Sequence, residues 1–307
     1  MSSVKKYLSL VKFSHTIFAM PFAIIGFFLG VYRYEFPGST GWHTFVGSAI
    51  LNYFKLFMLV VLCMIFARSA AMAFNRFLDR NFDAKNPRTA IHEIPTGIIS
   101  KESALRFVII NCLLFIAATY FINRICFLLA PVALFVILFY SYTKRFTPLC
   151  HLVLGIGLSL APIGAYLAVT GAFAFLPILF SFAVIFWVSG FDIIYALQDV
   201  EFDQSQKLYS MPAWLGKAKA LKVSEILHVL SASCVVFAGV YGHFGWWYWI
   251  GIAVFTGMLI YQHSIVKAND LSKVNIAFMT ANGIASVVFS VFVLLDIFLH
   301  NHPYNIF

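Results

Sequence analysis

The chain has 307 residues, of which 62% are hydrophobic and 11% are charged, whereas about 25% of residues are charged in typical soluble domains. This composition excludes an ordinary soluble protein, and apolar runs recurring from Thr16 to Leu299 indicate one polytopic membrane domain over residues 1–307. The net charge of +9 does not predict nucleic-acid binding, because the cations stand between apolar runs, where they report membrane orientation. The five cysteines form no C-x-x-C pair and indicate neither a disulfide framework nor a zinc site.

Windows of about 20 apolar residues, the length at which an α-helix crosses a bilayer, predict an all-α bundle of nine transmembrane helices. In chain order the expected helices are residues 15–34, 50–76, 104–122, 125–142, 149–170, 174–198, 223–241, 246–266 and 275–299. Of the 21 Lys and Arg residues, 17 lie in alternate connecting segments that include the N-terminal tail. The positive-inside rule therefore places the N-terminus in the cytoplasm and, with nine spans, the C-terminus outside.

A first acidic motif stands at the end of the second predicted helix. Asn75, Asp79 and Asp83 are spaced four residues apart. Because each step of four residues returns to within roughly 40° of the same helix face, the amide and the two carboxylates are expected to form one stripe.

A second acidic motif follows the sixth predicted helix. By the same arithmetic, Asp192 lies about 20° and Asp203 about 40° from Asp199 around the helix axis. Glu201 points to nearly the opposite side. Three carboxylates are therefore expected on a second stripe, and Glu201 is expected to take no part.

Crowded carboxylates at a membrane boundary repel one another and need a positive partner. Two acidic stripes that face each other indicate Mg²⁺, which prefers oxygen ligands and bridges carboxylates to substrate phosphates. Basic residues near the same helix ends predict a diphosphate pocket with metal on one side and cations on the other. These basic residues are Arg80, Lys85, Arg88, Lys144 and Arg145. The chain has neither a Walker motif nor G-x-G-x-x-G, so a nucleotide is not the expected phosphate donor.

The two motifs resemble those of the UbiA superfamily of intramembrane prenyltransferases, which has N-x-x-x-D-x-x-x-D after its second helix and D-x-x-x-D after its sixth. The likeness covers nearly the whole chain and is close to the 4-hydroxybenzoate polyprenyltransferase-like branch. Further shared residues are Arg68, Arg88-Thr89, Pro95-x-Gly97 and Tyr142-x-Lys144-Arg145. The chain departs from the family pattern at Arg76, where many members have Asp, at His92-Glu93, where a second Arg is usual, and at Tyr209, where a basic residue is common.

The resemblance implies transfer of a polyprenyl group from its diphosphate to an aromatic acid of the 4-hydroxybenzoate type in respiratory quinone biosynthesis, with Mg²⁺ as cofactor. The same chemistry on a dihydroxynaphthoate acceptor for menaquinone is the alternative. The resemblance also implies an integral protein of the bacterial inner membrane, with its active site on the cytoplasmic side. Its partners would be polyprenyl diphosphate, the aromatic acid and the lipid bilayer, and no nucleic acid.

The resemblance further implies a role for each motif residue. The residues expected to hold Mg²⁺ or its bound water are Asn75, Asp79, Asp199 and Asp203. Those expected to act in catalysis, as further ligands or by orienting the acceptor, are Asp83 and Asp192. Those expected to bind substrate are Arg68, Arg88, Tyr142, Lys144 and Arg145.

A membrane transporter or channel is the alternative from another class, because intramembrane acids often mark ion paths. Transporters, however, place such charges at the midplane on interrupted helices of inverted repeats, whereas the acids here cluster at helix ends on one side. The aromatic run Trp246–Trp249 is expected to form an interfacial belt. The histidines in or near predicted spans, all expected to be packed or interfacial, are His15, His151, His228 and His263.

Overall fold

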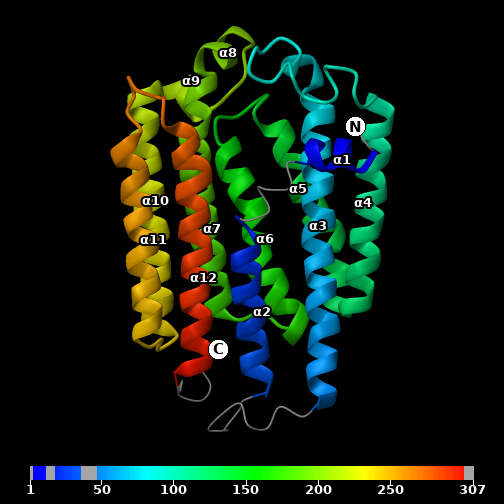
Figure 1. Ribbon diagram of the computed structural model, residues 1–307, viewed down its shortest axis with the longest axis vertical. Helices are drawn as coiled ribbons and strands as arrows, with labels where there is room; N and C mark the ends of the chain where they lie inside the picture. The colour runs from blue at the N-terminus through cyan, green and yellow to red at the C-terminus, as the bar shows by residue number, and fades with distance from the viewer. Residues whose placement is uncertain (1–2, 12–17, 36–46, 301–307) are drawn as a thin grey trace.

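The computed structural model describes residues 3–11, 18–35 and 47–300, and within these ranges it contains helices and no β-strand (Figure 1). The long helices of the bundle are α2 (Met20–Glu35), α3 (Gly47–Asp83), α4 (Lys101–Ile122), α5 (Arg124–Thr143), α6 (Cys150–Thr170), α7 (Phe175–Ala196), α10 (Lys217–Tyr241), α11 (Trp246–Ile265) and α12 (Asn282–Leu299). The short elements are α1 (Ser3–Leu10), the 3₁₀ turn η3 (Leu197–Asp199), α8 (Val200–Ser205), α9 (Met211–Leu215) and the π-helical η4 (Ile276–Ala281). The all-α fold class is confirmed.

Seven helical segments within the described ranges are long and apolar enough to cross a membrane. They contain α3, α4, α5, α6, α7, α10 and α12. The long helices follow the nine predicted ranges, but α2 is shorter than the seven and α11 is not among them. Residues 15–17 of the first predicted helix, including His15, lie outside the described residues. The count of nine spans therefore stays a prediction.

The expected aromatic belt at the start of α11 forms only in part. Trp246 is 64% exposed, whereas Tyr248 is fully buried in the core. The Tyr248 hydroxyl donates a hydrogen bond to the carbonyl oxygen of Val235 at 2.7 Å. A buried Tyr needs such a partner, so Tyr248 is a packing residue of the α10–α11 pair rather than a member of the belt.

Close backbone contacts hold the centre of the bundle together. A Cβ atom at Gly26 would lie 2.0 Å from the carbonyl oxygen of Pro162, so only glycine permits α2 to approach α6 this closely. Small residues at such contacts are typical of helices that pack inside membranes. The side chain of Trp187 on α7 is fully buried, and its Nε1–H donates to Asn282 Oδ1 at 2.9 Å. This buried hydrogen bond therefore links α7 to α12.

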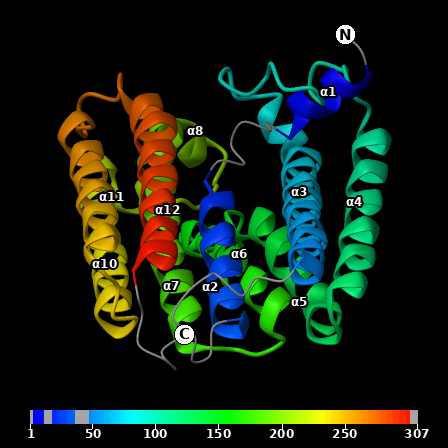
Figure 2. The same cartoon turned by 60° about the horizontal axis from the view of Figure 1, so that its bottom comes forward.

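One end of the bundle carries both acidic motifs. Helix α3 ends there, and the loop of residues 84–100, α8 and α9 lie at the same end (Figure 1). Figure 2 shows α1 lying across this end beside that loop, whereas α12 finishes at the opposite end of the bundle. The charged residues of both motifs therefore lie at the same end of the bundle, which we call the rim.

The sequence predicts that the second acidic motif lies on one continuous helix, but the structure divides the motif among three elements. Helix α7 ends at Ala196, a 3₁₀ turn follows, and Asp199 has φ −107° and ψ 7° before α8 begins. The side-chain amide of Gln198 donates to the carbonyl oxygen of Tyr195 at 3.2 Å, as side chains often do at a helix end. The angular prediction for Asp199 and Asp203 is therefore wrong, because it assumes α-helical geometry beyond Ala196.

Candidate active site

A pocket of about 310 Å³ lies at the rim, between α3 on one side and α6, α7 and η4 on the other. The predicted site residues that line it are Arg68, Asn75, Asp79, Asp83, Arg88, Lys144, Asp192, Asp199 and Asp203. Apolar residues complete the wall, among them Phe18, Leu158, Phe191 and Phe278. The pocket therefore combines a charged half with an apolar half.

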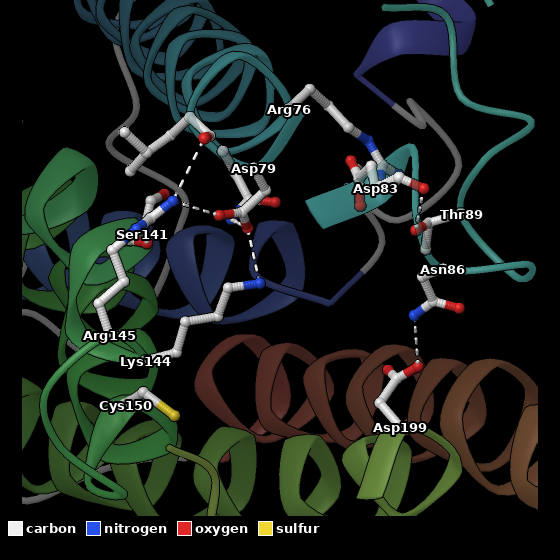
Figure 3. A network of polar contacts seen from close by, with 12 residues as sticks. Arg76, Asp79, Asp83, Asn86, Thr89, Ser141, Lys144, Arg145, Cys150 and Asp199 are labelled. Carbon is white, nitrogen blue, oxygen red and sulfur yellow. Dashed lines mark hydrogen bonds and ion pairs between the residues drawn. The ribbon is translucent and has the colours of Figure 1, made fainter. Parts of the chain in front are cut away.

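Asp79 is the most enclosed carboxylate of the charged half, with 4% of its side chain exposed. It accepts hydrogen bonds from Asn75 Nδ2 at 3.2 Å, Lys144 Nζ at 2.7 Å and Arg145 Nη2 at 2.8 Å (Figure 3). Burial disfavours the charged form of Lys144, but the adjacent Asp79 outweighs it and raises the pKa of Lys144 above its usual value. Two cations that directly follow α5 thus neutralise the first motif.

Asp199 is held by the loop that follows α3. Arg88 donates from Nε to Asp199 Oδ1 at 3.0 Å and from Nη2 to Oδ2, so the pair is bidentate. Asn86 Nδ2 donates to the same Oδ1 at 3.2 Å (Figure 3), and Arg88 Nη1 donates to the Tyr195 hydroxyl at 2.9 Å. Burial lowers the pKa of Arg88, yet the contacts with Asp199 outweigh it, so the pKa is raised. The loop thereby bridges the two motifs.

Two departures from the family pattern meet at Asp83. Arg76 Nη1 lies 2.5 Å from His92 Nδ1 and 3.7 Å from Asp83 Oδ2, and His92 Nδ1 lies 3.2 Å from the same oxygen. All three side chains are buried and line the pocket. The sequence predicts no contact between Arg76 and His92, because 16 residues and a helix end separate them. In the structure they form the immediate surroundings of Asp83.

The two remaining acids have partners on α6 and α9. His151 Nδ1 lies 2.6 Å from Asp192 Oδ2, and the Ser210 hydroxyl donates to Asp203 Oδ2 at 2.7 Å. Ser210 also caps α9, since its Oγ accepts the backbone N–H of Ala213. His151 therefore faces the pocket in addition to being packed, a position that its place in an apolar run does not reveal.

Three further residues differ in their relation to the pocket. The buried Nε of Arg68 has no hydrogen-bond partner among the described residues. Arg145 contacts Asp79 but is not among the lining residues, and its guanidinium lies 5.2 Å from the ring centre of Tyr142. Tyr142 is 44% exposed and lies outside the lining, because it follows the pocket-facing Ser141 by about 100° around α5.

The apolar half contains aromatic residues whose place in the pocket the sequence alone does not predict. Phe18, Phe191 and Phe278 lie in mutual contact, with ring centres 5.4 to 5.6 Å apart. Tyr195 stacks on Phe278 with ring centres 4.2 Å apart. The π-helix η4 sets the position of Phe278, and no sequence signal distinguishes this turn from ordinary helix.

The donor set fits Mg²⁺ by its chemistry. Carboxylate and amide oxygens from two chain segments line one pocket, and Mg²⁺ prefers such ligands. Among the described residues, no group of three or more His, Cys, Asp or Glu side chains is close enough to hold a metal alone. Mg²⁺ is usually held by one or two carboxylates together with substrate phosphates, so this arrangement suits a metal that arrives with an anionic substrate.

Known proteins share both the fold and the sequence pattern. The UbiA prenyltransferase family matches residues 19–284. The 4-hydroxybenzoate octaprenyltransferase of Nitrosomonas eutropha is 30% identical over 237 residues, which cover 76% of this chain and 82% of that relative. The enzyme of the same name from Coxiella burnetii is 25% identical over 264 residues, covering 85% of this chain and 90% of that relative.

Solved structures agree with this result. The apo structure of a UbiA homologue from Aeropyrum pernix K1 has a TM-score of 0.78 at 27% identity and covers 92% of this chain and 98% of its own. A UbiA homologue from Archaeoglobus fulgidus bound to DMAPP and Mg²⁺ has the same fold, with a TM-score of 0.69 at 22% identity over 96% of this chain and 99% of its own. The resemblance drawn from the double acidic motif is confirmed, and the chain belongs to the UbiA prenyltransferase family.

Proposed function

We propose that this aromatic prenyltransferase transfers a polyprenyl group from polyprenyl diphosphate to an aromatic acid of the 4-hydroxybenzoate type, with Mg²⁺, in respiratory quinone biosynthesis. The observation that carries the proposal is the pocket itself, in which acids and cations from separate segments face an apolar wall. The names of the curated relatives support the acceptor class, and the homologue with bound DMAPP and Mg²⁺ supports the donor and the metal.

The charged half is proposed to bind the diphosphate and the metal. The residues that would hold Mg²⁺ are Asn75, Asp79, Asp199 and Asp203. When bound, Mg²⁺ stabilises the negative charge of the departing diphosphate. Asp83, which is enclosed by Arg76 and His92, is better placed to support this group than to bind metal directly.

The cations that pair with the pocket carboxylates are proposed to bind the phosphate oxygens. Lys144 and Arg145 pair with Asp79, and Arg88 pairs with Asp199. With a dication and an anionic substrate bound, the carboxylates would hold the dication and these cations would bind the phosphates, so the local charge would stay balanced. Arginine suits this role because its planar guanidinium matches phosphate oxygens with two parallel hydrogen bonds.

The apolar half is proposed to shield the reacting carbon and to contact the prenyl chain. Phe18, Phe191 and Phe278 contact one another and line the pocket. Aromatic faces stabilise positive charge, which develops on the prenyl group as the diphosphate leaves. Moving each CH₂ group of the prenyl chain out of water contributes about 0.8 kcal/mol of favourable free energy. A long prenyl chain is therefore best accommodated by a pocket that opens toward lipid.

The acceptor is proposed to lie beside Asp192 and Tyr195. A bond forms between the prenyl carbon and a ring carbon of the acceptor while the bond from that prenyl carbon to the diphosphate oxygen breaks. The ring then loses a proton, and Asp192 is the carboxylate we assign to orient the acceptor and to receive that proton. Arg68, whose Nε has no hydrogen-bond partner among the residues that the structure describes, is assigned to the acceptor carboxylate.

We also propose that one domain extends over residues 1–307 and that the pocket faces the cytoplasm of a bacterial inner membrane. The orientation is supported by the 17 Lys and Arg residues in alternate connecting segments. These segments include the loop of residues 84–100 at the pocket rim.

The test is a transfer assay with purified protein in lipid. The protein is incubated with radiolabelled polyprenyl diphosphate and with 4-hydroxybenzoate, dihydroxynaphthoate or no acceptor, each with Mg²⁺ and again with EDTA. Prenylated hydroxybenzoate formed only with Mg²⁺ supports the proposal. Product from dihydroxynaphthoate alone favours the menaquinone alternative, and absence of transfer to either aromatic acid overturns the proposal.

A further inference from the structure

His151 is hydrogen-bonded through both of its ring nitrogens. Nδ1 lies 2.6 Å from Asp192 Oδ2, and the backbone N–H of Met211 donates to Nε2 at 3.2 Å. The His151 side chain is 5% exposed, and both His151 and Asp192 line the pocket. The ring is therefore held at two opposite atoms by two different parts of the chain.

These contacts set which nitrogen carries the proton. A backbone amide only donates, so Nε2 must accept and carries no proton. In a neutral imidazole the proton then resides on Nδ1, which donates to the carboxylate of Asp192. Met211 is the first residue of α9, where backbone N–H groups lack partners within the helix. The start of α9 therefore sets the tautomer of a histidine on α6.

The close packing of α6 on α7 brings the pair together. A Cβ atom at Gly155 would lie 2.5 Å from the carbonyl oxygen of Ile185 and 2.6 Å from Ser189 Oγ, so the helices meet here without a side chain between them. Ser189, which is fully buried, donates to the His151 carbonyl oxygen at 3.1 Å. One turn along each helix from this contact, His151 and Asp192 face each other.

Within the described ranges, the Asp192 carboxylate makes no hydrogen bond or ion pair besides the one with His151, and 24% of its side chain is exposed. One oxygen is thus fixed by His151, while the side chain remains accessible from the pocket. A carboxylate held at a single oxygen keeps one orientation and leaves lone pairs free for a substrate hydroxyl or proton. This arrangement differs from Asp79 and Asp199, which cations hold at both oxygens.

We propose that His151 is a positioning residue for the prenyl transfer, which holds the Asp192 carboxylate in the orientation that meets the aromatic acceptor. The inference rests on the proposed function, because it assigns the acceptor side of the same pocket. If the inference is right, loss of the His151–Asp192 hydrogen bond lowers turnover without lowering protein stability. If His151 only packs, its substitution lowers turnover only as far as it destabilises the contact among α6, α7 and α9.

Two substitutions separate these roles. In His151→Asn, the side-chain amide nitrogen lies close to the position of Nδ1 and keeps the bond to Asp192, while the contact with Met211 is lost. In His151→Gln, the amide group reaches the position of Nε2 and keeps the Met211 contact, while the bond to Asp192 is lost. The two variants therefore remove one hydrogen bond each from the same residue.

The experiment measures kcat, the KM for each substrate and the thermal melting temperature of both variants in lipid. We expect His151→Gln to melt near wild type and to lose about 10- to 100-fold in kcat, with little change in the KM for polyprenyl diphosphate. We expect His151→Asn to melt lower but to keep a kcat near that of wild type. Wild-type turnover in His151→Gln, or loss of turnover that only follows melting temperature, would overturn the inference.

Two controls complete the design. His263→Gln changes a histidine outside the pocket lining and is expected to leave turnover unchanged. In an Asp192→Asn background, His151→Gln should cause no further loss if the histidine acts through Asp192; a full additional loss contradicts the inference. If the wild-type protein transfers to no aromatic acceptor, the proposed function fails, and this outcome is distinct from a His151→Gln variant that retains full turnover.

Discussion

The two acidic motifs of the pocket are built in different ways. Asn75, Asp79 and Asp83 lie on one uninterrupted helix, so their common face follows from helical spacing. Asp192, by contrast, lies on α7, and Asp199 ends the 3₁₀ turn that follows this helix. Regular helical spacing therefore does not explain why both carboxylates line the same pocket. One motif is therefore a property of local sequence and the other is a property of the fold.

The largest expected effects come from removing the carboxylates that cations contact at both oxygens. Asp79→Asn leaves Lys144 and Arg145 without their anion, and Asp199→Asn leaves Arg88 without its anion. We expect either change to lower kcat/KM by about 10³-fold, because each removes a proposed metal ligand and a charge partner. The measurement is the transfer assay at saturating Mg²⁺.

Glu201→Gln is the matched control, because Glu201 lies beside the second motif but its side chain is 77% exposed and pairs with Lys217. It should retain wild-type turnover. If Asp79→Asn also keeps turnover close to wild type while folding normally, the assignment of the first motif to metal is wrong.

The next largest effect tests the link between the motifs. Arg88→Lys keeps the positive charge but loses the bidentate contact with Asp199 and the bond to Tyr195. We expect the KM for polyprenyl diphosphate to rise by about 10-fold or more, since a hydrogen bond to a charged group contributes about 1.5–3 kcal/mol. Steady-state kinetics with varied donor concentration measure this change, and an unchanged KM would contradict a phosphate-binding role for Arg88.

A smaller effect on turnover but a clear effect on stability is expected at Arg76. Arg76→Ala leaves Asp83 and His92 buried without their arginine, and breaking a buried ion pair lowers the free energy of unfolding by about 3–5 kcal/mol. The double variant Arg76→Ala/Asp83→Asn should recover part of this loss, because the unpaired charge is gone. Denaturant unfolding in detergent provides the measurement, and strictly additive losses would show that the two residues do not act as a pair.

The smallest expected effect is a pH dependence at Lys144. Because the pKa of Lys144 is raised in the folded protein, its ion pair stabilises the fold fully below the unfolded-state pKa of about 10.4. This contribution is lost only as the pH rises through the higher folded-state pKa. The melting-temperature difference between wild type and Lys144→Met should therefore stay constant from pH 7 to about pH 9 and shrink above about pH 10.5. A difference that shrinks near neutral pH would contradict the sign of this shift.

The same contrast explains what the sequence reveals. The sequence predicts the helix that carries Asn75 and Asp79, because apolar length and four-residue spacing are local properties. It does not predict the geometry around Asp199, because no local pattern indicates the 3₁₀ turn. Nor does it place His151 and Phe278 in the pocket, since their positions depend on the α6–α7 contact and on a π-helical turn. Residues whose partners lie on other helices need the folded chain to be identified.

The pairing of each principal cation with a carboxylate of the same pocket has a consequence for selectivity. An inorganic phosphate ion that approaches Lys144 or Arg88 must displace Asp79 or Asp199 without supplying a dication in exchange. Asp79 and Asp199 therefore compete with soluble anions for the cations of the pocket. Under the proposed function, a substrate that arrives with Mg²⁺ would compensate the displaced carboxylates, and its apolar chain would contact the aromatic residues of the pocket. The charged residues would then favour such a substrate over a free phosphate ion.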